Sequence, residues 1–184
     1  MRIQFPLILA GVLTLAPVAA QAATGGAYAD FSTISLGSSS IPRLTGLSMG
    51  GYAEGHPKRF SNLLDLGVDA RITGGSATTN GVWYMYGALL IGPEVSFKTH
   101  ITSLRPYAEV LVGAAQMTTQ YPDTSLNINS QNNVSNNYGQ VSFIGGTDIN
   151  LLPHLAWRAL ELNYGKFNGI SSTTISTGLV LRLP

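Results

Sequence analysis

The stretch Leu63-Leu64-Asp65-Leu66-Gly67-Val68-Asp69-Ala70-Arg71-Ile72-Thr73-Gly74 alternates between apolar residues and polar or small ones. Because successive side chains of a β-strand point to opposite faces, it predicts a strand with one apolar face and one charged face. A soluble antiparallel sheet turns its apolar face to the protein core. A membrane barrel turns that face to lipid and its charges inward. The direction in which this strand faces is therefore the central question about the chain.

The same arrangement recurs along the whole sequence. Eight of the nine acidic residues stand singly between uncharged, mostly apolar neighbours, and the ninth, Asp123, lies in a polar stretch. Strand alternation places four basic residues on the same face as these eight acids. We predict that the barrel interior holds a network of charged residues made of Asp30, Glu54, Asp65, Asp69, Arg71, Glu94, Lys98, Arg105, Glu109, Asp148, Glu161 and Arg182.

The composition favours the membrane alternative. Charged residues make up 10% of the chain, against about 25% in ordinary soluble domains. No stretch after residue 22 is apolar for long enough to form a transmembrane helix, so a membrane-spanning form requires strands closed into a barrel. The chain has no cysteine and a net charge of +1. It therefore has no thiol to acylate or oxidise and no basic excess that would predict a nucleic-acid partner.

The first 22 residues have the pattern of a signal peptide. Arg2 is followed by the apolar run Phe5 to Ala19 and by Ala20-Gln21-Ala22, which offers small residues where a signal peptidase cuts. The run is shorter than the ~20 residues of a membrane span. We predict a cleaved signal peptide at 1–22 and one domain at 23–184, exported by a bacterium. An uncleaved anchor is the alternative.

We predict an all-β fold, an eight-stranded antiparallel up-and-down transmembrane β-barrel. The second, fourth and sixth connections are short and the odd ones are longer, as in membrane barrels with short periplasmic turns and long external loops. The segment Asn127 to Asn137 should then be an exposed external loop. The predicted strands are 26–37, 44–55, 62–74, 82–98, 105–118, 138–151, 155–166 and 171–183.

Three segments carry a resemblance to a known family. They are Gly92 to Phe97 with Arg105 to Gly113, then Gly145 to Asn150 with the strand that follows, and the C-terminal Ser176 to Leu183. The chain resembles small eight-stranded outer-membrane β-barrels, the group of the OmpA transmembrane domain and the opacity-type surface antigens. The resemblance implies insertion into an outer membrane, with a structural or surface-exposed role and no assigned chemistry.

The resemblance also implies partners. Ser176, Gly178, Leu181 and Leu183 are similar to the C-terminal signal read by the barrel-assembly machinery, although the chain ends in Leu-Pro where many such barrels end in Phe. We expect a monomer in contact with outer-membrane lipid, with any extracellular ligand bound by the loop 118–137.

The interior of an eight-stranded barrel is just wide enough to be filled by side chains. We therefore interpret the inward charges as an ion-paired plug and not as an aqueous pore. The eight acids exceed the four inward bases, so some acids must be protonated, hydrated or near the rims. A cation-binding or proton-conducting lumen is the functional alternative.

A few residues depart from the regular pattern. Arg158 shares its alternation with Leu160 and Leu162, so it should face lipid near the periplasmic headgroups, unless a bulge turns it inward. Pro93 should mark a bulge or the end of regular pairing. His56, His100 and His154 fall one in each predicted periplasmic turn, where hydrated turn residues are favoured over a metal site.

Two other classes of function remain open. A periplasmic lipocalin-like carrier would have an apolar lumen, and the acids would then face outward. A lipid-modifying outer-membrane enzyme is the second, but no His-x-Ser pair, phosphate-binding loop or metal motif is present. We predict no catalytic residues, no cofactor and no metal.

Overall fold

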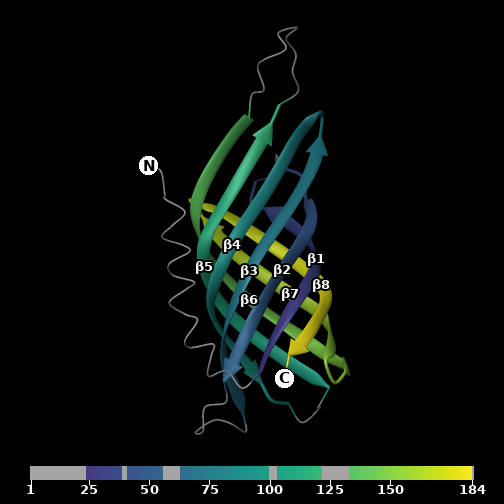
Figure 1. Ribbon diagram of the computed structural model, residues 1–184. Coiled ribbons are helices and arrows are strands. Elements are labelled where there is room, and N and C mark those ends of the chain that lie inside the picture. The colour runs from purple at the N-terminus through teal and green to yellow at the C-terminus, as the bar shows by residue number, and fades with distance from the viewer. Residues whose placement is uncertain (1–23, 39–40, 56–62, 100–102, 122–132, 184) are drawn as a thin grey trace.

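The computed structural model describes residues 24–38, 41–55, 63–99, 103–121 and 133–183. Its strands form one closed barrel in which every strand pairs antiparallel with its chain neighbours and the last strand closes on the first (Figure 1). Within the described residues, no helix has the length and apolar character needed to cross a membrane. The strands are β1 (Thr24–Leu36), β2 (Leu44–Gly55), β3 (Leu64–Thr79), β4 (Val82–Phe97), β5 (Leu104–Gln120), β6 (Asn133–Leu152), β7 (Leu155–Phe167) and β8 (Ile170–Leu183).

The predicted fold class is confirmed, and the strand bounds differ mainly at one end of the barrel. β3 runs to Thr79, where the sequence predicted a loop after residue 74. It joins β4 through a two-residue turn, Asn80 and Gly81, both with positive φ (53° and 77°). These angles suit the hairpin turn whose twist matches that of paired strands. β6 begins at Asn133 instead of 138, so the predicted loop Asn127 to Asn137 is in part a strand.

The two faces of the wall differ in chemistry. In β3, Asp69 and Arg71 are 0% and 1% exposed, whereas Ile72 beside them is 60% exposed. Phe31, in the middle of β1, is 74% exposed. Large apolar side chains therefore cover the outer face, and most of the charged side chains point inward.

The interior has two parts. The half nearer the upper end of Figure 1 holds a buried apolar cluster that includes Ile34, Leu90, Leu111 and Phe167. Below it a chain of hydroxyl groups crosses three strand boundaries. Ser32 Oγ lies 2.8 Å from Ser48 Oγ and 3.0 Å from Ser176 Oγ, and Ser48 Oγ lies 3.1 Å from Thr73 Oγ1. The remaining, lower part of the interior is filled by charged residues and tyrosines.

A bulge in β7 corrects the predicted orientation of Arg158. Leu160 pairs with Thr147 of β6, and Arg158 pairs with the next residue, Asp148, so Ala159 is an extra residue. The register with β8 shifts at the same place. One extra residue reverses the alternation below it. Arg158 is therefore buried inside the barrel at 1% exposure, the reverse of its expected orientation, and Trp157 faces outward.

Pro93 does not produce the bulge that was one of its two predicted effects. Val68 and Pro93 pair in an unbroken β3–β4 register. On the β5 side the ladder passes from the Ile91–Val112 pair to the Glu94–Glu109 pair without a register shift. Proline has no N–H to donate, so pairing is interrupted locally while the strand continues to Phe97.

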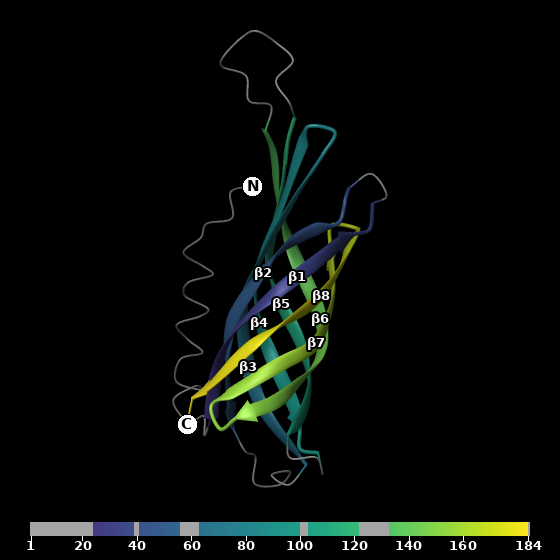
Figure 2. The same cartoon turned by 90° about the vertical axis from the view of Figure 1, so that its right-hand side faces the viewer.

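Four strands extend beyond the others at the upper end. The last β2–β3 pair is Thr45 with Ser76, and the uppermost β6–β7 pair is Gln140 with Phe167. Above these points β3, β4, β5 and β6 stay paired with one another as far as the Gln120–Asn133 pair. They form a protruding sheet that stands clear of β1, β2, β7 and β8 (Figure 2).

Candidate functional site

Three arginines organise the charged part of the interior. Arg71 contacts carboxylates on three strands, Asp69 at 3.1 Å, Glu109 at 2.6 Å and Glu161 at 2.7 Å. All four side chains are 1% exposed. The five N–H donors of a guanidinium suit several carboxylates at once. This cluster links β3, β5 and β7 across the interior of the barrel.

Arg158 forms the second cluster. It contacts Asp148 at 3.1 Å, Asp30 at 3.3 Å and Glu161 at 3.0 Å. Because Glu161 bonds to Arg71 as well, it joins the first two clusters. Removing the β7 bulge would turn Arg158 out of this network, so the bulge is what places its charge among the acids.

Arg105 forms the third cluster, towards the lower end. It bonds to Glu54, to Glu94 at 2.9 Å and to Asp148 at 3.3 Å. Ser96 Oγ donates a hydrogen bond to Glu54 at 2.6 Å. At the rim, Lys98 pairs with Asp65 at 3.0 Å, with 39% of the lysine side chain exposed. Arg182 is half-buried at the same end.

Three tyrosines complete the network, and the sequence reasoning missed them. Tyr28 Oη donates to Asp69 at 2.8–2.9 Å, and Tyr107 Oη donates to Glu161 at 2.8 Å. The Arg158 guanidinium lies over the Tyr28 ring at 4.0 Å, and that of Arg105 lies over the Tyr52 ring at 4.9 Å. Stacking of this kind stabilises an arginine that has left water.

A repeated tripeptide was the available signal for these tyrosines. Tyr28-Ala29-Asp30, Tyr52-Ala53-Glu54 and Tyr107-Ala108-Glu109 each place a tyrosine two residues before an inward acid, on the same face. Each tyrosine is paired across the strands with a glycine. An added Cβ on that glycine would lie only 2.4–2.6 Å from the tyrosine side chain. Because these glycines have no side chain, the tyrosine rings can fill the space beside them. The pairs are Tyr28 with Gly50, Tyr52 with Gly26 and Tyr107 with Gly146.

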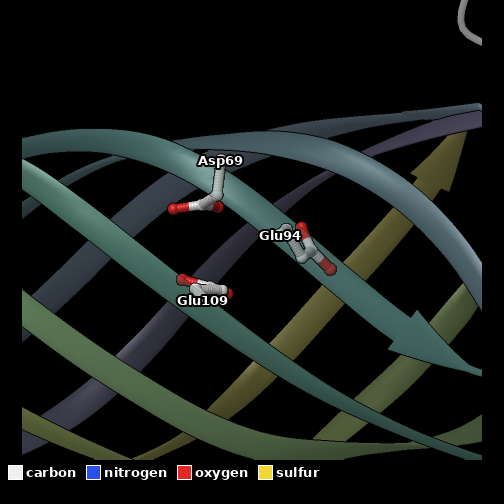
Figure 3. A group of neighbouring side chains, drawn as sticks. All are labelled: Asp69, Glu94 and Glu109. Atoms are coloured by element: carbon white, nitrogen blue, oxygen red, sulfur yellow. The ribbon is translucent and has the colours of Figure 1, made fainter.

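One group of acids has the spacing of a cation site. Asp69, Glu94 and Glu109 project inward from β3, β4 and β5 (Figure 3), with one oxygen of each within 4.8 Å of the others. Carboxylate oxygens of this kind are ligands for Ca²⁺ or Mg²⁺. Two arginines already contact the group, Arg71 at Asp69 and Glu109 and Arg105 at Glu94. The positive charge beside these acids is thus supplied by the chain itself.

The inward acids outnumber the inward bases. All eight acids of the alternating pattern are buried, and the bases among the described interior residues are Arg71, Lys98, Arg105, Arg158 and Arg182. Glu94 Oε2 and Asp30 Oδ1 are buried without a hydrogen-bond partner. The surplus is therefore three acids, one fewer than the sequence implied, because Arg158 points inward.

The other predicted residues lie along β8 and in the connections between strands. Ser176 of β8 is buried, whereas Leu181 and Leu183 are 52% and 54% exposed on the outer face. Gly178 approaches β1 so closely that an added Cβ would lie 2.2 Å from the Ala29 carbonyl oxygen. His154 is exposed in the turn between β6 and β7, and His56 and His100 lie outside the described residues.

The protruding sheet leaves part of its backbone unpaired. Residues Asn133 to Gly139 pair with β5 on one side, and no described strand pairs with them on the other. This edge carries no charge and no proline. On the outer face, Ser135 Oγ lies 3.0 Å from Gln116 Nε2 and 3.1 Å from Thr118 Oγ1. The inner face carries Tyr138, whose ring packs 5.6 Å from that of Phe167.

Known structures resemble this barrel, although no protein-family model and no curated protein sequence matches the chain. Ail, the attachment invasion locus protein of Yersinia pestis, is 15% identical, with a TM-score of 0.56 and coverage of 87% of this chain and 97% of Ail. Neisserial surface protein A is 14% identical, with a TM-score of 0.59 and coverage of 86% and 95%.

A major outer membrane protein from Thermus thermophilus is 12% identical, with a TM-score of 0.57. The alignment covers 88% of this chain and all of the Thermus chain. Each alignment covers nearly the whole of the matched structure, and sequence identities of 12–15% show a similarity of fold alone. The chain therefore has the fold of the small eight-stranded β-barrels of bacterial outer membranes.

Proposed function

We propose that this protein is a monomeric, non-catalytic outer-membrane barrel that recognises an extended protein segment at the cell surface. The protruding sheet carries the proposal. An unpaired edge of seven residues, Asn133 to Gly139, is a template for an added strand. Natural proteins usually protect such edges with lysine, proline or a bulge, and this one has none of the three.

The apolar outer face supports the proposed location. Leu47, Phe143 and Leu162 are each about half exposed, on β2, β6 and β7. Such a surface around the whole wall suits lipid contact and not water. We place the end at which β1 begins and β8 ends in the periplasm, which puts the protruding sheet outside the cell. Residues 1–22 would act as the export signal, and Ser176, Gly178, Leu181 and Leu183 would be read during assembly.

The protruding sheet offers side-chain contacts as well as backbone. Tyr84 and Tyr138 are half-buried on its inner face, with Met117 between them on β5. Tyrosine gives a large contact area at a low cost in conformational entropy, so it is common in recognition surfaces. Ail has been crystallised with the heparin analogue sucrose octasulfate. The uncharged edge described here suits a peptide strand better than a sulfated sugar.

A matched deletion tests recognition by this edge. Removing residues 117–120 together with 133–136 shortens the β5–β6 hairpin by four pairs and keeps the alternation of faces. Phage-displayed peptides selected on the intact protein in nanodiscs should protect the amides of 133–139 from hydrogen exchange, and they should lose binding to the shortened form. Peptides that bind both forms equally, or that protect only other segments, would contradict the proposal.

The packed interior leads to an expectation about conduction. The clusters of Arg71, Arg105 and Arg158 fill the lower interior, and the apolar cluster around Leu111 fills the upper one. We expect no stepwise single-channel currents in planar bilayers, because an eight-stranded barrel filled by side chains leaves no aqueous path. A 16-stranded porin in the same bilayer is the positive control. Steady cation-selective steps from the purified monomer would favour the conducting-lumen alternative instead.

A further inference from the structure

The free edge of the protruding sheet is complementary to a second copy of itself. Its inner face carries Val134, Asn136 and Tyr138, which are evenly spaced about Asn136, and its outer face carries the residues between and beside them. If two such edges pair antiparallel with Asn136 opposite Asn136, every residue from Asn133 to Gly139 has a partner in the other copy. Directly opposite residues of an antiparallel pair lie on the same face, so the two inner faces join into one continuous surface.

The apolar side chains that meet in this register suit one another. Val134 of one copy lies opposite Tyr138 of the other, and this pair occurs twice. Val134 is 51% exposed, and the centroid of the Tyr138 ring already lies 5.6 Å from that of Phe167. Pairs of a β-branched and an aromatic residue stabilise neighbouring strands. The valine of the second copy therefore extends an apolar contact that the barrel already has.

The polar residues of the edge also fit a second copy. On the outer face Ser135 lies opposite Asn137, a pair that can form a hydrogen bond, and the two Asn136 amides can each donate and accept one. Any charge in this edge would occur twice in the pair, and like charges on facing strands destabilise a sheet. The edge carries no charge, so this repulsion is absent. A partner with charged side chains would gain no ion pair here, which favours the identical uncharged edge as the occupant.

The direction of the strands decides how the two barrels are oriented. Side by side in one membrane, two such edges would run parallel, and their inner faces would lie on opposite sides of the joint sheet. Antiparallel pairing inverts the second barrel, because the two-fold axis is then perpendicular to the sheet. The protruding sheet stands clear of β1, β2, β7 and β8 (Figure 2), so an inverted copy can reach its edge from above. This register therefore joins barrels of two facing membranes.

We propose that the free edge binds the same edge of a second copy in a facing outer membrane, and that this contact holds two cells together. The inference rests on the proposed function, because it names the extended segment that the edge recognises. Seven residues a side make a small contact compared with the ~20–30 residues a side of a standard interface. One pair is therefore weak, and each barrel remains a monomer in its own membrane. Many pairs between two apposed membranes act together, which raises the overall affinity without new contacts.

Disulfide trapping between nanodiscs that hold one barrel each tests the register. The chain has no cysteine, so each introduced thiol reports one position. Asn136→Cys should form dimers that join two discs, because directly opposite Cα atoms lie ~4.5–5.5 Å apart, within reach of a disulfide. Asn133→Cys and Gly139→Cys should each stay unlinked alone and should link when mixed, since each lies opposite the other and about 20 Å from its own copy. A Cβ at Gly139 meets no atom within 4 Å, so this substitution is accommodated.

An exchange of charge at the centre of the pair tests the contact without a disulfide. Asn136→Lys should lower the association of vesicles that carry the protein at least fivefold, because like charges then lie directly opposite. Asn136→Glu should do the same, whereas vesicles with the lysine variant should associate with vesicles that carry the glutamate variant. Asn136→Gln keeps an amide at the centre and should retain the association. Gel mobility of unboiled samples checks that every variant forms a barrel.

The outcomes separate this inference from the proposed function. Self-linking of Asn133→Cys as fast as that of Asn136→Cys would overturn the register. Lysine and glutamate vesicles that stay apart would overturn the pairing of identical edges. If selected peptides protect the amides of 133–139 while no disc pairs form, the edge binds a segment of another protein, and the proposed function stands without this inference.

Discussion

Arg71→Met should lower the free energy of unfolding by about 3–5 kcal/mol, the cost of breaking a buried ion pair by removing one partner. The substitution keeps most of the side-chain volume and removes the guanidinium from among Asp69, Glu109 and Glu161. Asp69 and Glu109 would then lose their arginine in an interior from which water is excluded, while Glu161 would keep its contact with Arg158. Urea unfolding in lipid vesicles, followed by the fluorescence of the two tryptophans, measures the loss.

Lys98→Met is the matched control at the rim. Its pair with Asp65 is 3.0 Å long, but 39% of the lysine side chain is exposed, so the loss should stay within about 1 kcal/mol. Adding Glu109→Gln to Arg71→Met should recover part of the stability, because it removes one of the orphaned charges. Equal losses for Arg71→Met and Lys98→Met would show that the interior is hydrated and that the arginine clusters do not form a plug.

The sequence predicts most of this barrel because its strands follow one rule, the alternation of apolar and polar side chains. Single acids between apolar residues mark the inward positions wherever a strand is regular, as in Asp65 and Asp69 of β3. The rule fails at Arg158, because a single extra residue, Ala159, reverses the alternation and nothing in the local sequence marks it. The long β6 was missed because its asparagine-rich upper part has loop composition, and pairing with β5 overrides that preference.

The arginine clusters could not be predicted from a sequence pattern. The alternation of side chains along a strand predicts that Arg71 and Glu161 both face inward. It does not predict that they meet across the barrel at 2.7 Å. That contact depends on the strand tilt and register of the closed sheet. The Tyr-Ala-acid repeat is different, since the matching glycines lie opposite in the ladder and could be found once the pairing of strands was known.

Phe31→Arg should lower the free energy of unfolding in a bilayer by about 2–4 kcal/mol, the cost of an arginine on the lipid face near the midplane. Phe31 lies near the middle of β1, is 74% exposed and pairs with Leu47 and Thr177. On a surface in contact with water, the same substitution would stay within about 0.5 kcal/mol. The experiment therefore separates a lipid-facing wall from a water-facing one.

Phe31→Leu keeps the position apolar and should be nearly neutral. Folding into vesicles is followed by the gel mobility of unboiled samples, and stability by urea titration. The same energetic cost of a charge on the lipid face applies to the natural basic residues of the outer face. Lys166 lies at the upper end of β7 and Arg43 directly before β2, where the cost of a charge falls to about 0–1 kcal/mol. If Phe31→Arg were as stable as Phe31→Leu and folded in plain buffer, the apolar face would not contact lipid and the lipocalin-like alternative would gain support.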